Sequence, residues 1–275
     1  DMKIHSTGKE EEYSGGNEAF RMKASENWQR LYNSLTNEQR KSWDAAYEPK
    51  NRAFLEANLS GIELAKWKYQ RYIKDYLRCV ASVDDNIGRL LDYLDEHGLT
   101  ENTVVIYTSD QGFYLGEHGW YDKRFMYEES LGMPLIIRYP QEISAGMTLD
   151  EMVLNLDFCP TILDYAGVEV PAEIQGESLR SLLRGHPSPQ WRQMIYYHYY
   201  EYPHGWHDVK RHYGIRTQKF KLIHFYDDID AKELYNLQQD PHELNNVYGR
   251  PQLNGIQNEL ETQLKELKNY YMDYE

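Results

Sequence analysis

The sequence predicts an α/β protein, in which an α/β sandwich is followed by a small α+β unit. A long helical pattern precedes two apolar, β-branched runs at 103–108 and 134–139, and a loop separates these runs. Such runs are typical of strands buried on both faces, so this order predicts a sandwich around a mostly parallel sheet. After Gly185 the chain changes to strand-like segments at the spacing of antiparallel hairpins. We therefore expect two domains, at residues 1–187 and 188–275.

The first domain is expected to begin with a polar segment and continue into helices. Residues 1–27 are rich in Glu, Gly and Ser, which favours a surface loop or linker. Short helical patterns follow, with breaks near Thr36 and Pro49. The strongest helical pattern covers about 62–97, where apolar residues recur at steps of three and four, and Gly98 provides a C-terminal stop.

The later elements complete both domains. Asp157 is expected to cap a helix that has Pro160 in its first turn. In the second domain an amphipathic helix at about 253–270 is expected to follow an antiparallel sheet. The strands of that sheet are predicted at 194–200, 212–217, 220–225 and, in a shorter piece, near Leu234.

Composition narrows the classes of function. The 275 residues contain 30 Lys and Arg against 44 Asp and Glu, which gives a net charge of −14. Such a surface repels the phosphates of nucleic acids and anionic membranes, so we expect neither as a partner. No apolar run reaches the roughly 20 residues that a membrane span needs. The two cysteines are too few for a disulfide framework.

The most informative segment is the loop at 109–124, which leaves the carboxyl end of a predicted strand. Open α/β sheets place their ligand sites at this edge. Asp110 and Gln111 offer a carboxylate and an amide oxygen side by side, and two hard oxygen donors suit Ca²⁺ or Mg²⁺ better than zinc. Lys123 and Arg124 bring positive charge to the same loop, as needed to bind an anionic group and to stabilise its leaving oxygen.

Residues 103–140, which include this loop with Gly-Glu-His-Gly inside it and Asp-Lys-Arg at its end, resemble the second half of the signature of the type I sulfatases. These enzymes belong to the alkaline-phosphatase-like superfamily. The similarity continues through 157–167, 175–185 and 234–246, and it covers most of the chain beyond residue 60. The chain is most similar to bacterial glycan sulfatases, including N-acetylglucosamine-6-sulfatase-like members. The resemblance implies an alkaline-phosphatase-like α/β/α sandwich and a sulfuric ester hydrolase that removes O-sulfate from sulfated sugars.

The resemblance also implies roles for residues of the loop. Asp110 and Gln111 would be two of the ligands of a Ca²⁺ ion, with Mg²⁺ less favoured. Lys123 would hold the sulfate and assist the leaving oxygen. His118 would line the site, and a purely structural role for this histidine stays equally open.

Three further residues would face the sugar that carries the sulfate. Asp122 and Arg124 flank the lysine, and His198 lies in a tyrosine-rich predicted strand of the second domain. A histidine packed among aromatic residues is the alternative interpretation of His198. The substrate implied is a sulfated carbohydrate, and the family's usual location would be the periplasm or the cell exterior.

Two parts of the sulfatase site are not found in this sequence. The nucleophile of the family is a formylglycine, made from the Cys or Ser of a C/S-x-P/A-x-R motif, and neither Cys79 nor Cys159 lies in that pattern. The periodicity around Cys79 indicates packing within the long helix. Asp84 and Asp85 fall in that helix too and are interpreted as a solvated face, not as the paired aspartates of the metal site.

We therefore expect this chain to be the C-terminal portion of a sulfatase, with the formylglycine in a preceding portion, and to be inactive by itself. Two alternatives stay open. A phosphatase, phosphodiesterase or phosphonate-cleaving relative would share the fold and the metal position, although those relatives favour paired zinc ions with additional histidines. A non-catalytic glycan-binding fragment is the alternative outside enzymes.

Overall fold

The computed structural model describes residues 28–202 and 208–274, and their contacts form two compact units. The first unit contains residues 28–90 and 114–121, and the second contains 91–113 with the described residues from 122 onwards. The loop expected at 1–27 lies outside the described residues. The domain boundary near residue 188 stays a prediction.

The first unit is helical. A helical segment at 28–34 precedes α2 (Asn37–Ala57), and Thr36 caps α2 through reciprocal hydrogen bonds with Gln39. The expected break near Thr36 is therefore confirmed, whereas the break near Pro49 is wrong because Pro49 lies inside α2. Packing on both sides of the proline outweighs its local cost.

Helix α3 (Gly61–Glu96) confirms the long helix predicted from periodicity. Its first half packs on α2: the ring of Trp67 stacks on Phe54, with 4.0 Å between centroids. The apolar residues in the second half of α3 are exposed within the described residues. Cys79 is exposed too, so the packing predicted around Cys79 from the periodicity is wrong here. Asp84 and Asp85 are exposed, as expected. The exposed apolar residues include Leu77 (53%), Val80 (42%), Val83 (49%) and Leu90 (55%).

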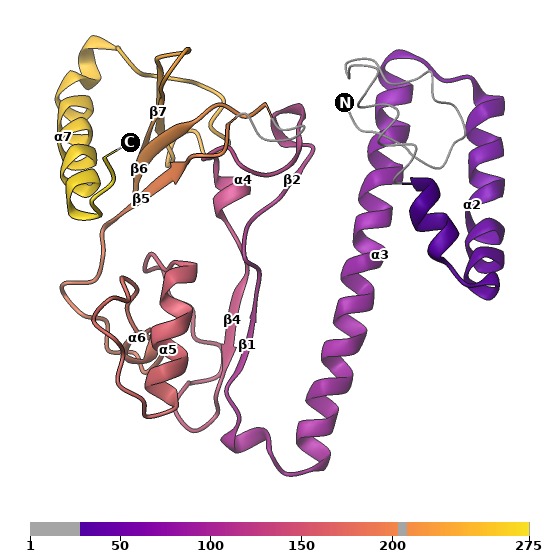
Figure 1. Ribbon diagram of the computed structural model, residues 1–275, viewed down its shortest axis with the longest axis horizontal. Helices are drawn as coiled ribbons and strands as arrows, with labels where there is room; N and C mark the ends of the chain where they lie inside the picture. Colours follow the sequence, from indigo (N-terminus) through magenta and orange to yellow (C-terminus); the bar gives the residue numbers. More distant parts are fainter. Residues whose placement is uncertain (1–27, 203–207, 275) are drawn as a thin grey trace. The chain divides into compact units, whose positions relative to one another are not determined.

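In the second unit, β1 (Val105–Thr108) and β4 (Leu135–Arg138) form a two-stranded sheet (Figure 1). The strands pair antiparallel, so the expectation of a mostly parallel sheet is wrong for this pair. A parallel pair needs a crossover that carries the chain back along the strand, and the connection here contains no long helix. Both strands expose one face, with Tyr107 37% and Ile136 63% exposed, and are not buried on both sides.

Two helices, α5 (Phe158–Tyr165) and α6 (Arg180–Leu183), lie beside this sheet. Asp157 precedes α5 but makes no capping bond to it. The fully buried carboxylate instead accepts hydrogen bonds from the backbone of Leu154 and Glu177 and pairs with Arg192. The apolar core here is formed by Leu179, Leu182, Leu183 and Trp191, against Leu135 and Ile137 of β4.

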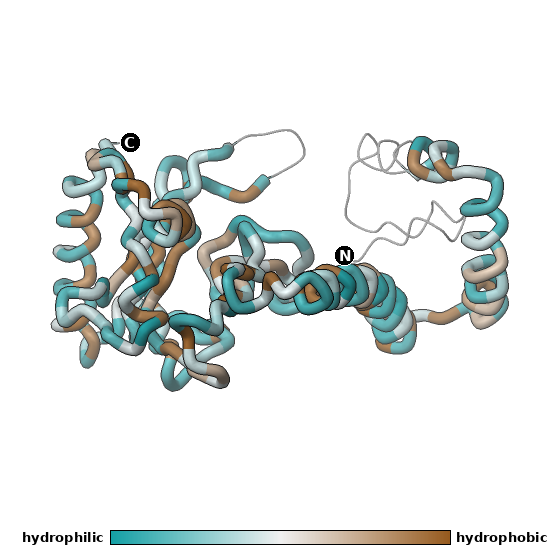
Figure 2. The backbone as a smooth tube through the Cα atoms, turned by 90° about the horizontal axis from the view of Figure 1, so that it is seen from below, coloured by the Kyte–Doolittle hydropathy of each residue, from teal (hydrophilic) through white to brown (hydrophobic). Residues whose placement is uncertain are grey.

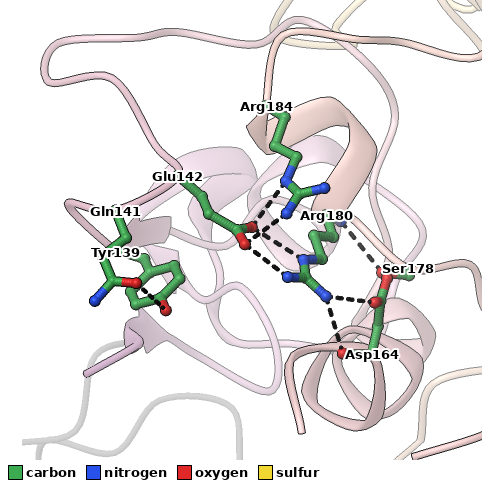
Figure 3. Close-up of polar contacts among 7 residues, drawn as sticks. All are labelled: Tyr139, Gln141, Glu142, Asp164, Ser178, Arg180 and Arg184. Atoms are coloured by element: carbon green, nitrogen blue, oxygen red, sulfur yellow. Dashed lines mark hydrogen bonds and ion pairs between the residues drawn. The ribbon is translucent and has the colours of Figure 1, made fainter. Parts of the chain in front are cut away.

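A cluster of charged side chains fastens the loop after β4 to these helices (Figure 3). Glu142 accepts paired hydrogen bonds from both Arg180 and Arg184. Arg180 also binds Asp164 at 3.0 Å, and Ser178 donates to that same carboxylate. Bonds from both guanidinium groups hold the pKa of Glu142 well below its usual range, at about 2. Every charge in the cluster is paired within it, which indicates a structural role.

The remainder of the second unit is a four-stranded antiparallel sheet with one covering helix, as predicted. The strand order follows the sequence, and α7 (Asn254–Tyr270) supplies Leu260 and Leu264 to the core. Figure 2 colours hydrophobic positions brown in both the strands and α7, where they alternate with hydrophilic ones. The strands are β5 (Met194–Tyr199), β6 (His212–Thr217), β7 (Phe220–Phe225) and β8 (Ala231–Asn236).

Short 3₁₀ turns connect several of these elements. They are η2 (Thr100–Asn102), η4 (Asn155–Asp157) and η5 (Pro251–Leu253). Within the described ranges, no helix is both long enough and apolar enough to cross a membrane.

Candidate active site

The metal-ligand pair predicted from the sequence lies just beyond the carboxyl end of β1. Asp110 is exposed, and its carboxylate accepts a long hydrogen bond of 3.4 Å from the hydroxyl of Ser109. Gln111 follows and is half-buried. The structure thus puts a carboxylate and an amide next to one another at a strand end, where the motif predicted them.

Ser130, in the short helix α4 (Glu128–Leu131), joins the two ends of the motif. Its carbonyl accepts from the Gly112 N–H at 2.9 Å, and its hydroxyl accepts from the Arg124 N–H at 3.0 Å. Gly112 lies flat on this helix, because a Cβ there would come within 2.1 Å of the Glu129 carbonyl oxygen. The oxygen donors and the basic residues, which are far apart in the loop, are therefore anchored at one residue.

The basic residues share a single carboxylate. The Lys123 ammonium lies 3.1 Å from one oxygen of Asp122, and the Arg124 guanidinium pairs with the other. Lys123 keeps 31% of its side chain exposed, whereas Arg124 keeps 14%. Lys123 is thus the more accessible cation, while Arg124 and Asp122 are already engaged with one another.

The backbone on both sides of Lys123 is strained. Asp122 has φ of 81° and Arg124 has φ of 106°, values that L-residues with a Cβ rarely adopt. The Arg124 carbonyl accepts a hydrogen bond of 2.7 Å from the hydroxyl of Tyr197 in β5. Strain of this kind tends to persist where surrounding bonds fix the backbone, and it clusters at functional sites.

Buried charges anchor α4 to the C-terminal sheet. The fully buried ammonium of Lys221 in β7 lies 2.8 Å from Glu128 and 2.7 Å from the equally buried Glu243. Glu243 also accepts from the Glu128 N–H at 2.7 Å, and Arg216 binds Glu128 through two nitrogens. Burial raises the pKa of Glu243, and Lys221 opposes that rise. These contacts fix the helix that carries Ser130.

His118 belongs to the first unit, whereas the other predicted site residues belong to the second. It lies in η3 (Glu117–Gly119) with φ of 56°, between the short strands β2 (Tyr114–Leu115) and β3 (Tyr121–Asp122). Its ring meets that of Tyr114 edge-on at 6.0 Å and lies 5.6 Å from that of Trp120. These contacts are compatible with either role expected for His118.

His198 is packed inside the C-terminal part of the second unit. Its side chain is 2% exposed, with Nδ1 lying 2.5 Å from Asp273 and Nε2 2.7 Å from the Tyr226 hydroxyl. Burial raises the pKa of Asp273, but hydrogen bonds from Tyr196, His198 and Tyr200 outweigh it and hold that pKa at about 2. Because both ring nitrogens are engaged, the geometry favours the packed histidine over the sugar contact.

The donors at the strand end fit a hard divalent cation in kind but not in number. A carboxylate and an amide are oxygen donors that Ca²⁺ accepts, yet the ion usually takes about six to eight ligands. Among residues 28–202 and 208–274, no group of three or more His, Cys, Asp and Glu side chains is placed to hold a metal. Asp110 and Gln111 would therefore form part of a metal shell.

Sequence reasoning missed three residues that hold the site together: Ser130, Tyr197 and Lys221. None of them lies in the motif, and Tyr197 and Lys221 reach it from strands far along the chain. The excess of tyrosine in the predicted strand at 194–200 was the one available signal. It does not distinguish a tyrosine that holds the site from one that lines the core.

Comparison with known families gives two matches. A family model described as Sulfatase matches residues 2–168, and one described as N-sulphoglucosamine sulphohydrolase, C-terminal, matches residues 116–270. Together they cover nearly all of the chain; Asp110 lies in the first match, and Lys123 lies in the overlap at 116–168.

Several characterised proteins are similar to this chain. An N-acetylglucosamine-6-O-sulfatase of Bacteroides thetaiotaomicron is 53% identical over 245 residues, which are 88% of this chain and 44% of that protein. A solved structure described as a complex with its substrate D-glucosamine-2-N,6-O-disulfate superposes with a TM-score of 0.86. It is 52% identical and matches 90% of this chain and 50% of its own. The chain thus spans about half the length of these relatives.

A more distant neighbour is the phosphonate monoester hydrolase of Silicibacter pomeroyi. It is 29% identical with a TM-score of 0.61, covering 70% of this chain and 40% of the hydrolase. The sulfatases among the structural neighbours have the alkaline-phosphatase-like fold, which confirms the predicted fold class.

Proposed function

Because the chain belongs to the sulfatase family, we propose that it forms part of an enzyme that hydrolyses the 6-O-sulfate ester of N-acetylglucosamine or a related glucosamine unit in glycans. The observation that supports this proposal is that Gly112, next to the oxygen donors, and Arg124, next to Lys123, both bind Ser130 through their backbone N–H groups. The choice of sugar rests on the 53% identity to an N-acetylglucosamine-6-O-sulfatase.

Lys123 is the residue to which we assign chemistry. Its ammonium lies at 3.1 Å from Asp122 and keeps part of its surface open, so it is positioned to contact an anionic substrate. As the ester bond to the sugar breaks, negative charge grows on the leaving oxygen. A preorganised ammonium stabilises that charge more than it stabilises the ground state, and this difference lowers the barrier.

Asp122 and Arg124 are proposed to orient Lys123 and to border the sugar. The Asp122 carboxylate divides its two oxygens between the cations, so one carboxylate orients both Lys123 and Arg124. We assign His198 a supporting role within the C-terminal sheet, because its nitrogens bind Asp273 and Tyr226. His118 stays a candidate for lining the site.

Asp110 and Gln111 are proposed to contribute two ligands to a Ca²⁺ ion, with Mg²⁺ as the alternative. When bound, the ion would neutralise sulfate charge. Calorimetric titration of Ca²⁺ into the chain checks this assignment without an activity assay. We expect weak binding that Asp110→Asn reduces further and that Asp228→Asn, at an exposed loop carboxylate, leaves unchanged.

The formylglycine nucleophile is not assigned to any residue of this chain. Cys79 and Cys159 lie within helices and outside the required motif. We propose that the nucleophile comes from a portion of the enzyme beyond these 275 residues and that the chain alone is inactive.

A periplasmic or extracellular location is likewise a proposal, made from the family resemblance.

Cleavage of a phosphorus ester is the second candidate function, since the phosphonate monoester hydrolase is 29% identical to this chain. Parallel assays of the complete enzyme on 6-O-sulfated N-acetylglucosamine, 3-O-sulfated glucosamine and phenyl phosphonate separate the candidates. We expect a preference for the 6-O-sulfate. A preference for the phosphonate would overturn the proposal, and binding of desulfated and sulfated sugar without turnover would favour the glycan-binding alternative.

Lys123→Ala tests the assignment of the catalytic group. Loss of one preorganised donor costs roughly 10²–10³ in kcat, and we expect a loss of that size in the complete enzyme. Lys219→Ala is the matched control, because Lys219 is an exposed lysine of the same unit. An unchanged kcat in Lys123→Ala would remove Lys123 from the mechanism.

A further inference from the structure

The strained segment around Lys123 is held from both sides by hydrogen bonds to its backbone. Ser130 accepts from the Arg124 N–H at 3.0 Å, and the Tyr197 hydroxyl donates to the Arg124 carbonyl at 2.7 Å. The two holding groups come from different elements, α4 and β5. The peptide groups on both sides of the Arg124 Cα, where φ is 106°, are therefore each held by a hydrogen bond.

Tyr197 is suited to this task. Its side chain is half-buried, and burial raises its pKa to about 12, so the hydroxyl keeps its proton and donates throughout the neutral range. The strand that carries it pairs with β6, which in turn pairs with β7. Tyr197 is thus part of the C-terminal sheet and not of the loop, and its position does not depend on the loop conformation.

The residues that follow Arg124 hold the segment in place because they are buried. Met126 is fully buried and Tyr127 nearly so. Gly214 of β6 makes room for Met126, because a Cβ on Gly214 would lie 2.5 Å from the Met126 sulfur. Because the residues after Arg124 are buried against the sheet, they cannot move if the strained φ relaxes. Relaxation would instead move the residues before Arg124, which are Lys123 and Asp122.

We propose that Tyr197 and Ser130 are positioning residues for Lys123: by fixing the peptide groups of Arg124 they hold its backbone in the strained form that keeps the lysine on Asp122. The inference rests on the proposed function in that Lys123 is the group whose position affects turnover. The positional claim itself concerns the 275-residue chain, and it is open to measurement without any substrate.

The first measurement is the rate at which an amine-acylating reagent labels Lys123 in the 275-residue chain, followed by mass spectrometry. In the native chain the contact with Asp122 and the partial burial of Lys123 slow labelling. We expect Tyr197→Phe to raise the Lys123 rate several-fold while the Lys219 peptide in the same sample keeps its rate. Tyr248→Phe is the control, because it loses a hydroxyl bond to Glu261 on the helix α7.

The second measurement is turnover by the complete enzyme. Displacement of a catalytic group by about 1 Å costs on the order of 10²-fold, so Tyr197→Phe should lower kcat by roughly ten- to a hundredfold with little change in KM. The loss should be greater on a sugar sulfate than on an aryl sulfate, whose leaving oxygen needs less stabilisation. In the Lys123→Ala background, Tyr197→Phe should have almost no further effect on kcat.

The outcomes separate the two claims. Unchanged labelling of Lys123 in Tyr197→Phe, or additive losses in the double variant, would overturn the positioning role. Raised labelling in a chain whose complete native enzyme cleaves no sulfate ester would support the positioning role and remove the proposed function. If Tyr197→Phe does not fold, as judged by its thermal unfolding, Ser130→Ala provides the same test from the opposite side of Arg124.

Discussion

His212 should make the stability of this protein depend on pH. His212 is the first residue of β6, and its ring is fully buried. The ring centroid lies 4.9 Å from that of Phe225 and 5.5 Å from that of Tyr199, on which the ring stacks. Its Nδ1–H donates to the Lys210 carbonyl at 2.7 Å. Burial lowers the pKa of His212 to about 4, with a smaller contribution from His198 in the same direction, while hydrogen bonding to the Lys210 carbonyl opposes the fall.

The size of the effect follows from proton linkage. Between about pH 6.5 and pH 4 the unfolded chain binds a proton at His212 that the folded chain does not bind, so stability falls as the pH falls through this window. With an unfolded pKa near 6.5 and a folded pKa near 4, the loss between pH 7 and pH 5 is about 2 kcal/mol. Below pH 4 the effect saturates.

Urea unfolding of the native chain and of His212→Gln at pH 7, 6 and 5 measures this contribution. Glutamine retains a donor for the Lys210 carbonyl but does not titrate, so its loss of ring packing is a constant offset. We expect the native and variant stabilities to converge by about 2 kcal/mol as the pH falls from 7 to 5. His186→Gln, at an exposed histidine, should keep the native pH dependence. Two parallel curves for the native chain and His212→Gln would refute the reasoning.

Three other predictions concern the anchoring of the site and the chain as a whole. Lys221→Met should cost about 3–5 kcal/mol of unfolding free energy, because it leaves Glu243 buried without its cation; adding Glu243→Gln should restore part of that loss in urea unfolding. Gly112→Ala should destabilise by about 1–3 kcal/mol through its clash with α4, whereas Gly88→Ala, in open space within α3, should stabilise by about 0.5–1 kcal/mol. The 275-residue chain alone should release no sulfate from an aryl sulfate, and turnover above a buffer blank would contradict the placement of the nucleophile elsewhere.

Elements with strong local patterns could be predicted from the sequence. The three- and four-residue steps gave the extent of α3 within about a residue at either end, and hairpin spacing gave β5 to β8 in the correct order. The motif placed Asp110 and Gln111 at a strand end because its residue types and spacing are specific. In each case the information lies within a few residues of the element it describes.

Features that depend on distant partners could not be predicted in this way. The antiparallel pairing of β1 with β4 depends on how the intervening chain returns, and periodicity does not report that. The strained φ of Arg124 occurs where its carbonyl accepts a hydrogen bond from Tyr197, 73 positions further along the chain. A histidine is a reasonable sugar contact by its chemistry, but His198 lies buried and pairs with Asp273 near the C-terminus, which its local sequence does not indicate. All three depend on contacts between residues that are far apart in the sequence.

The attachment of both Gly112 and Arg124 to Ser130 has a consequence for how this family could diversify. The stretch between them is a loop whose two ends are held together by Ser130. Its length and composition therefore have little influence on how Gly112 and Arg124 are placed relative to one another. Closing a somewhat longer loop costs little additional entropy. Residues 114–121 should therefore be exchangeable between relatives with different sugar preferences while Gly112 and Arg124 stay bound to Ser130. Recombination within the loop could in this way change its sequence without changing the residues that we assign to the chemistry.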